Sequence, residues 1–310
     1  MNDDSTSAGI AEPVIETGTE TRVSAQRPSV IGHNGFEKKP TEVARKTQGP
    51  PKTIWREYFE SAVVTVIMAL FGMTFIVQAV KVPTGSMQNT ITIGDHLLVN
   101  KFIFAPGNPL PFLPQREIKR GDIIVFKYPG NEHNKAGDMK SDNIPFKTNY
   151  VKRVIGLPGD TVEVRGDRVY INGGLLPEHI IAAENHDEKA PLVVDGEITP
   201  RQPNEPYSVY YYPETIQASR NDRNPPASSD FFYAVNGKPF KVPNDSYFVM
   251  GDSRDNSSDS RAWGIVPREL VVGRAMFVYW SYDESKPSSG YFFLDFFRNS
   301  RWSRTGTMIK

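Results

Sequence analysis

Hydrophobic residues are distributed unevenly along the chain, and the longest apolar run is 61–80, SAVVTVIMALFGMTFIVQAV, which contains no charge. A helix of this length, at ~1.5 Å per residue, spans the ~30 Å hydrocarbon core of a bilayer. A buried helix of a soluble domain usually keeps a polar face. Here only four polar residues interrupt the apolar surface: Ser61, Thr65, Thr74 and Gln78. We therefore predict a transmembrane anchor helix over 54–80.

The segments that flank this run indicate its orientation. The run starts too late and is too long for the apolar region of a cleaved signal peptide. Trp55, Tyr58 and Phe59 form an aromatic belt at its start, and only Lys81 closely follows its other end. Basic residues gather before it: Lys38, Lys39, Arg45, Lys46, Lys52 and Arg56. The positive-inside rule then places the N-terminus in the cytoplasm and the rest of the chain on the exported side. Residues 1–53 are polar and aperiodic, which predicts a disordered cytoplasmic tail.

After Lys81 the pattern changes to short apolar runs bounded by Gly, Pro, Asn or Asp, which is typical of β-strands. The expected strands are 96–102, 122–127, 150–155, 161–165, 168–171, 246–250 and 270–279. Gly166-Asp167 and Asn172-Gly173 are hairpin-type dipeptides, so 161–171 should belong to a β-meander. We predict a mainly β, mostly antiparallel exported domain in two parts, 81–173 and 245–310.

Two further segments have a different character. Residues 174–244 are rich in Pro, Asn, Ser, Glu and Tyr, and we expect them to form an inserted smaller lobe, in which 207–212 (YSVYYY) is either a strand or an exposed aromatic patch. Residues 290–297 (GYFFLDFF) are very apolar but too short to span a bilayer, and three arginines follow them within 298–304. This segment fits either a membrane-interfacial element or an ordinary element docked on the core.

Composition excludes several kinds of chemistry. The formal net charge is zero, which gives no indication of nucleic-acid binding. There is no cysteine, so a disulfide scaffold, a thiolate nucleophile and a cysteine-ligated zinc site are excluded. We expect no cofactor and no metal.

The first candidate for chemistry is Ser86, in the turn 82–87 (VPTGSM) directly after the apolar run. Pro83 fixes one φ angle and Gly85 permits a close backbone approach, so the hydroxyl is presented as a nucleophile would be. The alternative is a solvated turn serine. A histidine would be the usual base for a serine nucleophile. None of the five histidines has a recognisable partner motif: His33, His96, His133, His179 and His186.

Lys152 is the alternative base. In the run 150–155 (YVKRVI) a period of two places it on one strand face with Tyr150 and Val154. Burial in such surroundings disfavours the ammonium and lowers the pKa of the lysine, and Ser-Lys pairs are a known variant of the catalytic triad. The alternative is a lysine whose charged end reaches the surface.

Four segments, in order, resemble the successive sequence boxes of bacterial type I signal peptidases: TGSMQNTITIGDHLLVNKF, RGDIIVFKYP, YVKRVIGLPGD and GDSRDNSSDSRAWGIVP. The resemblance covers the anchor and most of the core over 82–159 and 245–279, and leaves out the N-terminal tail and the middle insertion. It implies that Ser86 is the nucleophile and Lys152 the general base. It also implies that the Thr84 hydroxyl and the Ser86 backbone N–H form the oxyanion hole.

The last of these segments implies residues that support the pair. Ser257 corresponds to a serine that hydrogen-bonds and orients the lysine amine, and Asp259 and Arg261 correspond to a supporting ion pair. A calcium loop is the alternative for this acidic run, but arginines are interleaved with its carboxylates and the EF-hand spacing is absent. One departure is Asn89, which stands where the family usually has a proline.

The resemblance also implies a substrate and a location. The family cleaves signal peptides from secretory preproteins through an acyl-enzyme, at the bacterial inner membrane, with the catalytic domain on the periplasmic side. Membrane lipid and, by proximity, the secretion translocon are the other expected partners. Shallow apolar pockets for small substrate residues should involve Val80, Val82, Met87, Ile91, Val125, Tyr150 and Val151. Two alternatives stay open: an inactive, peptide-binding relative, and a processing peptidase with few dedicated substrates.

Overall fold

The computed structural model describes residues 53–105, 115–141, 143–184, 190–197, 200–222 and 225–310. Apart from Thr53, the predicted tail lies outside the described residues. Residues 54–310 form one compact unit.

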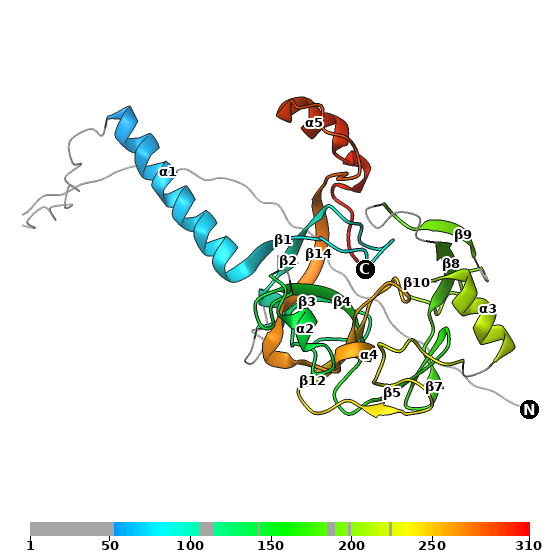
Figure 1. Ribbon diagram of the computed structural model, residues 1–310. Helices are drawn as coiled ribbons and strands as arrows, with labels where there is room; N and C mark the ends of the chain where they lie inside the picture. The colour runs from blue at the N-terminus through cyan, green and yellow to red at the C-terminus, as the bar shows by residue number, and fades with distance from the viewer. Residues whose placement is uncertain (1–52, 106–114, 142, 185–189, 198–199, 223–224) are drawn as a thin grey trace, which may run out of the picture. The chain divides into compact units, whose positions relative to one another are not determined.

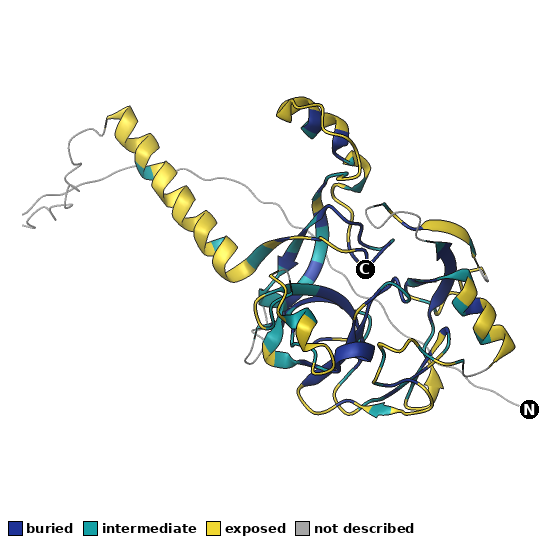
Figure 2. Cartoon of the chain, viewed as in Figure 1, coloured by how far each residue is buried: buried dark blue, intermediate teal, exposed yellow. Residues whose placement is uncertain are grey.

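The N-terminal helix is confirmed as an apolar segment long enough to cross a membrane, Ile54–Ile76. It consists of α1 (Ile54–Phe71) and a π-helical continuation, η1 (Gly72–Ile76). None of the residues of these two elements is buried, and Figure 2 shows the exposed surface along α1. The apolar side chains of the helix are therefore exposed, although Phe71 and Phe75 contact each other with ring centroids 5.0 Å apart.

The predicted end of this helix, at Val80, is wrong. The helix ends at Ile76 and the next residues form a strand, β1 (Val77–Lys81), antiparallel to β2 (Asp95–Asn100). Lys101 contributes to the helix end, because its Nζ donates to the Thr74 carbonyl (2.7 Å) and its backbone N–H to the Ile76 carbonyl (2.9 Å). These bonds satisfy carbonyls that a helix end leaves open, and pairing with β2 satisfies the backbone that follows.

The main sheet has seven strands in the order β1-β2-β14-β3-β4-β12-β13, and all neighbours are antiparallel (Figure 1). Its remaining strands are β3 (Ile123–Lys127), β4 (Asn149–Gly156), β12 (Ser246–Met250), β13 (Val266–Pro267) and β14 (Val271–Ser281). Strand β14 comes late in the chain yet lies between β2 and β3. The predicted antiparallel β architecture is confirmed.

A second sheet, of four strands in the order β11-β5-β6-β7, is also antiparallel. Its strands are β5 (Thr161–Arg165), β6 (Arg168–Ile171), β7 (Gly174–Leu175) and β11 (Phe240–Lys241). The pairing of β5 with β6 and of β6 with β7 confirms the predicted meander.

The third sheet has the order β10-β8-β9 and lies within 174–244. Its strands are β8 (His179–Glu184), β9 (Val193–Glu197) and β10 (Ser208–Tyr211), and helix α3 (Pro213–Asn221) follows. Strand β10 is parallel to β8, whereas β9 is antiparallel to it. Tyr207, Val209 and Tyr211 are buried, so the YSVYYY run is a strand and not an exposed aromatic patch.

The remaining elements are short. They are η2 (Phe102–Phe104), α2 (Lys135–Asp138), α4 (Ser260–Trp263), η3 (Arg268–Leu270), α5 (Phe292–Asn299) and η4 (Trp302–Arg304).

Both faces of the main sheet are covered by apolar side chains, as β3 shows. Ile123 and Val125 belong to one core cluster and Ile124 and Phe126 to another. The first cluster also contains Val151 of β4, and the second contains Val154 of the same strand. A strand buried on both faces is continuously apolar, which explains the sequence of β3, IIVFK.

The 174–244 segment is fastened to the main sheet's loops. The Arg254 guanidinium forms a fully buried ion pair with Glu178, with Nη1 2.8 Å from Oε2. The backbone N–H of Tyr210 donates to the Asp252 carbonyl and its carbonyl accepts from Arg254 N–H, each at 2.8 Å. These buried contacts attach the segment directly to the 251–261 loop, which holds Ser257, Asp259 and Arg261.

Candidate active site

Ser86 lies in the connection between β1 and β2. The ladder extends to Val82, whose N–H donates to the Asp95 carbonyl (2.9 Å), and a tight turn follows, with Gln88 N–H donating to the Gly85 carbonyl (3.0 Å). The Ser86 side chain is buried, and its backbone carbonyl accepts a hydrogen bond from Ser253 N–H (3.1 Å). The predicted turn is therefore present, with its serine turned toward the protein interior.

Strand β4 brings Lys152 to this serine. The Lys152 Nζ and the Ser86 Oγ lie 2.5 Å apart in a hydrogen bond, although the residues are 66 positions apart in sequence. Lys152 is 3% exposed. The ring of Tyr150, two residues earlier on the strand, has its centroid 5.3 Å from the amine. The structure thus brings together the two candidates that sequence reasoning reached independently.

Burial lowers the pKa of Lys152 from 10.5 to about 8. The negative charge of Asp259 opposes this effect and the positive charge of Arg261 adds to it. At a pKa of about 8 a sizeable share of the amine is uncharged near neutral pH, whereas an ordinary lysine is almost fully protonated. A neutral amine can accept a proton from a serine hydroxyl.

Asp259 is fully buried and accepts hydrogen bonds from several donors. Arg261 binds it through two nitrogens, Nε to Oδ1 (2.9 Å) and Nη2 to Oδ2 (2.8 Å). The Gly251 N–H (3.1 Å) and the Ser257 hydroxyl (2.8 Å) also donate to Oδ2. Burial alone would raise the pKa of Asp259, but the charge of Arg261 and these hydrogen bonds hold it below its usual value.

Ser257 lies near the pair but bonds differently from the expectation. In the described part of the chain its hydroxyl donates to Asp259 and not to Lys152. It is adjacent to the nucleophile turn, because a Cβ on Gly251 would lie 2.3 Å from both the Ser257 Oγ and the Ser86 carbonyl oxygen. The position therefore requires glycine, and any larger residue would separate the two segments.

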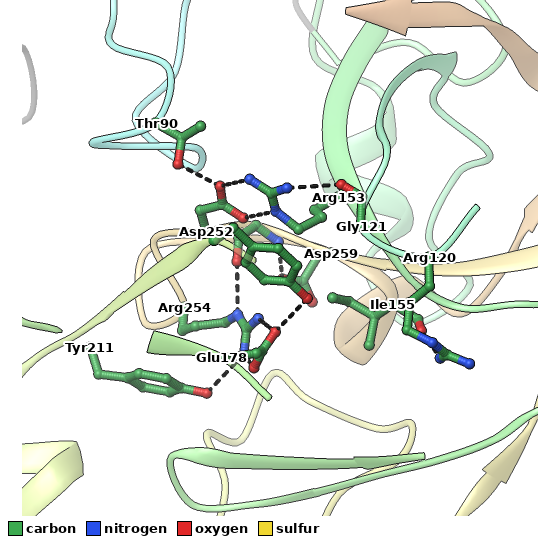
Figure 3. Close-up of polar contacts among 12 residues, drawn as sticks. Thr90, Arg120, Gly121, Arg153, Ile155, Glu178, Tyr211, Asp252, Arg254 and Asp259 are labelled. Atoms are coloured by element: carbon green, nitrogen blue, oxygen red, sulfur yellow. Dashed lines mark hydrogen bonds and ion pairs between the residues drawn. The ribbon is translucent and has the colours of Figure 1, made fainter. Parts of the chain in front are cut away.

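Sequence reasoning missed a second buried ion pair (Figure 3). Arg153 and Asp252 are each 1% exposed in their side chains and form two hydrogen bonds, Nε to Oδ1 (2.8 Å) and Nη2 to Oδ2 (2.7 Å). Asp252 Oδ2 also accepts a hydrogen bond from the Thr90 hydroxyl (2.6 Å), which connects the β1–β2 loop with Arg153 of β4 through Asp252. Both residues lie within the segments quoted above. They gave no signal of burial, because charged side chains beside a turn are more often solvated.

The predicted pocket residues divide into two groups. Six of them share one core cluster beside Ser86: Val80, Val82, Met87, Ile91, Val125 and Val151. Tyr150 lies apart from them, packed with the other cluster, where its ring stacks on Tyr128 at 4.7 Å. Thr84 is exposed, two residues before the serine.

The described histidines make contacts elsewhere. His96 stacks on Trp280 with ring centroids 4.6 Å apart, His133 stacks on Phe232 at 4.0 Å, and His179 hydrogen-bonds Ser208 at 3.0 Å. His33 and His186 lie outside the described residues. Among the described residues no group of three or more His, Cys, Asp or Glu side chains could hold a metal ion.

The model of a known protein family, signal peptidase (peptidase S26), matches residues 55–280. The chain belongs to the signal peptidase family. Its members are serine endopeptidases, and so is this chain.

Individual members of the family are similar to this chain. It is 33% identical over 239 residues to a probable signal peptidase I-2 of Synechocystis, which covers 77% of this chain and 79% of the relative. It is 32% identical over 280 residues to signal peptidase I of Pseudomonas fluorescens, covering 85% of each chain. A solved signal peptidase I of Enterococcus faecalis is 26% identical and covers 51% of this chain and 97% of its own, with a TM-score of 0.25.

The buried lysine gives a stability prediction. Between pH 8 and 10.5 the unfolded chain binds more protons at this position than the native state, so stability rises with pH there and Lys152 destabilises the fold below pH 8. The fall in pKa from 10.5 to about 8 corresponds to about 3 kcal/mol. We expect Lys152→Met to raise the free energy of unfolding at pH 7, measured by denaturant unfolding in detergent, and this gain to shrink toward pH 10.

Lys241→Met is the control, because Lys241 is exposed on β11. It should leave the pH dependence of stability as in the wild type. A Lys152→Met protein with the same pH dependence as the wild type would show that the amine is not desolvated.

Proposed function

We propose that this chain is a membrane-anchored endopeptidase that removes N-terminal signal peptides from exported preproteins with a Ser-Lys dyad. The observation that carries the proposal is the buried hydrogen bond between the Ser86 Oγ and the Lys152 Nζ, at 2.5 Å. A turn serine next to a lysine whose pKa burial lowers to about 8 has the chemistry of a nucleophile and its base. The signal peptidases to which the chain is similar supply the substrate class.

Acylation needs two proton movements. Neutral Lys152 accepts the Ser86 proton while Oγ attacks the scissile carbonyl carbon, which gives a tetrahedral oxyanion. The backbone N–H of Ser86 and the hydroxyl of Thr84 stabilise this oxyanion. Its collapse breaks the C–N bond, and the Lys152 ammonium returns the proton to the leaving amine of the mature protein.

Deacylation repeats the sequence with water. Lys152 accepts a proton from a water molecule, whose oxygen attacks the ester carbonyl of the acyl-enzyme. The second tetrahedral intermediate collapses with release of the signal peptide carboxylate, and the lysine returns a proton to the Ser86 Oγ. The same amine is thus base and acid in both halves.

Ser257, Asp259 and Arg261 act on the Ser86–Lys152 pair indirectly. Asp259 is held by two bonds to Arg261, and it fixes the Ser257 hydroxyl next to the Ser86 turn. The arginine also balances the carboxylate, which would otherwise raise the pKa of Lys152 and keep the amine charged. We assign these three residues positioning roles.

The apolar cluster beside Ser86 accounts for substrate selection. Val80, Met87 and Val151 are among its buried members, and together they form rigid aliphatic walls close to the nucleophile. Such walls accept small side chains, typically Ala, one and three residues before the scissile bond and exclude large side chains. Tyr150 packs with the other cluster, and its ring lies 5.3 Å from the Lys152 amine, so it would contact the substrate from the side of the base.

The anchor is the helix Ile54–Ile76, whose length and hydropathy suit a bilayer. The basic residues before it favour a cytoplasmic N-terminus, which puts the β domain on the periplasmic side of the inner membrane, near the translocon. Ser86 follows the helix end after one short strand, so the site lies close to the membrane, where a signal peptide emerges.

Helix α5 provides a second membrane contact, because its polarity is the reverse of that of a helix docked on a core. Asp295 and Asn299 are buried, whereas Phe292, Phe293 and Phe297 are exposed. Figure 2 shows α5 as largely exposed, with buried positions on it. The Asp295 carboxylate accepts from the Ser288 hydroxyl (2.6 Å) and the Ser289 N–H (2.8 Å). An aromatic face turned away from the protein fits the bilayer interface.

The assignment of the dyad predicts which variants lose activity. Ser86→Ala and Lys152→Arg should both abolish cleavage of a model preprotein by the full-length enzyme in detergent, because the first lacks the nucleophile and a guanidinium stays protonated. Wild-type kcat/KM should rise with pH through the pKa of Lys152, about 8. Ser285→Ala, in an exposed turn, is the control and should keep full activity. An active Lys152→Arg enzyme would refute the neutral-lysine mechanism.

The oxyanion role of Thr84 predicts a loss in kcat. Thr84→Val keeps the shape of the side chain but removes the hydroxyl, so kcat should fall by roughly 10²-fold or more with KM little changed. Thr84→Ser retains a hydroxyl and is the matched control, with activity close to wild type. Equal kcat values for the Val and Ser variants would exclude the hydroxyl from the oxyanion hole.

The α5 contact predicts fluorescence quenching by lipid. Trp302 lies next to the helix, with its ring centroid 6.2 Å from that of Phe297. In protein with Trp302 as its single tryptophan (Trp55→Phe, Trp263→Phe and Trp280→Phe), reconstituted into vesicles with brominated acyl chains, we expect Trp302 emission to be quenched, and Phe292→Ser with Phe293→Ser to reduce the quenching. Phe232→Ser, at an exposed phenylalanine stacked on His133, is the control. Unchanged quenching in the α5 variant would contradict the contact.

A further inference from the structure

The turn that carries Ser86 is bound to the inserted segment by three side-chain hydrogen bonds. Asn89 Nδ2 donates to the Leu192 carbonyl (3.0 Å) and its Oδ1 accepts from the Leu192 N–H (2.9 Å). Gln88 Nε2 donates to the Ala190 carbonyl (2.6 Å). Gln88 and Leu192 are buried, and Asn89 is half-buried. These contacts join residues more than a hundred positions apart, directly after the nucleophile.

The Asn89 contact has the geometry of a strand pair. One amide side chain engages both the N–H and the carbonyl of a single residue, Leu192. Two bonds to the backbone of one residue fix the rotation of the side chain as well as its distance, which a single hydrogen bond does not do. A side chain that lacks an amide, such as the proline that usually occupies this position in the family, cannot make this pair.

The segment on the other side of these bonds is itself anchored. Leu192 directly precedes β9, which pairs with β8, and β8 pairs with β10. Tyr210 of β10 then exchanges two backbone hydrogen bonds with the 251–261 loop, at Asp252 and Arg254. The same loop returns to the nucleophile turn through Ser253 N–H and the Ser86 carbonyl (3.1 Å). The insertion therefore braces the turn against the loop that carries Ser257 and Asp259.

From this closed path of contacts we infer that Asn89 is a positioning residue for Ser86, and that the inserted segment is part of the catalytic apparatus. The inference rests on the proposed Ser-Lys mechanism. The Ser86 Oγ must stay within hydrogen-bond reach of the Lys152 Nζ, and the irregular 83–94 connection has no regular ladder of its own to hold it there. A displacement of about 1 Å at a nucleophile can cost about 10²-fold in rate.

The test compares variants of the full-length enzyme on a signal-peptide substrate. Asn89→Ala removes both bonds to Leu192, and we expect kcat per folded enzyme to fall by about 10- to 100-fold with KM within about 2-fold of wild type. The alkaline rise of activity should keep its midpoint, because the surroundings of Lys152 are unchanged. Asn89→Asp has the same size but sets a carboxylate against the Leu192 carbonyl, so it should be as impaired as the alanine variant.

Asn172→Gly is the matched control. The side-chain amide of Asn172 also makes two hydrogen bonds, each at 2.8 Å: it accepts from Thr161 N–H and donates to Asp160. Asn172 lies between β6 and β7. Its φ of 51° suits glycine. This variant should keep the wild-type kcat. A merely structural role of Asn89 would lower the thermal midpoint and the folded fraction in both variants alike and leave kcat per folded molecule unchanged.

Hydrogen exchange gives a second readout that is independent of catalysis. Asn89→Ala should speed exchange of the Gln88 and Ile91 amides, which bond within the turn, while the amides of β12 stay protected. A wild-type kcat in Asn89→Ala or Asn89→Asp, or unchanged exchange in the turn, would overturn the inference. Absence of Ser86-dependent cleavage in the wild type would instead reject the proposed function, and the exchange measurement would still decide whether Asn89 holds the turn.

Discussion

The site depends on a lysine amine that is kept out of water. Lys152 lies on a strand between two apolar cores, and its burial disfavours the charged form enough to bring its pKa to about 8. The fold must therefore hold the amine rigidly without giving it a carboxylate partner. Asp259 is close enough to influence the amine, but two bonds from Arg261 occupy this carboxylate. A chain that exposed Lys152 would gain stability at neutral pH, but the pKa of the amine would return toward 10.5.

Three arginine-carboxylate pairs lie around the site of this buried lysine: Arg153 with Asp252, Arg254 with Glu178, and Arg261 with Asp259. All six side chains are almost completely buried. Removing one partner of such a pair typically lowers the free energy of unfolding by about 3–5 kcal/mol, because a buried charge is left uncompensated. The pairs therefore act less as a source of stability than as constraints that permit one arrangement of β4, the 251–261 loop and the inserted segment around the site.

Local sequence predicted seven of the strands, the serine turn and the candidate lysine, because period-two patterns and turn residues depend on near neighbours. Local sequence failed to predict structure that depends on contacts between residues far apart in the chain. Residues 77–80 continue the uncharged run of the helix, and only the pairing of Val77–Lys81 with β2 makes them a strand. Glu178 gave no signal, since its partner Arg254 lies 76 positions away. The polar side chains of Gln88 and Asn89 resembled those of any surface turn until Ala190 and Leu192 were placed against them.

The position of β14 has a consequence for the order in which the chain can assemble. In the main sheet the pair β1-β2, which flanks Ser86, is joined to the pair β3-β4, which includes Lys152, through β14, a strand that comes late in the chain. A nascent chain that has not yet delivered Val271–Ser281 has Ser86 and Lys152 on separate halves of an incomplete sheet. The hydrogen bond between these two residues therefore depends on a segment that is synthesised long after both of them.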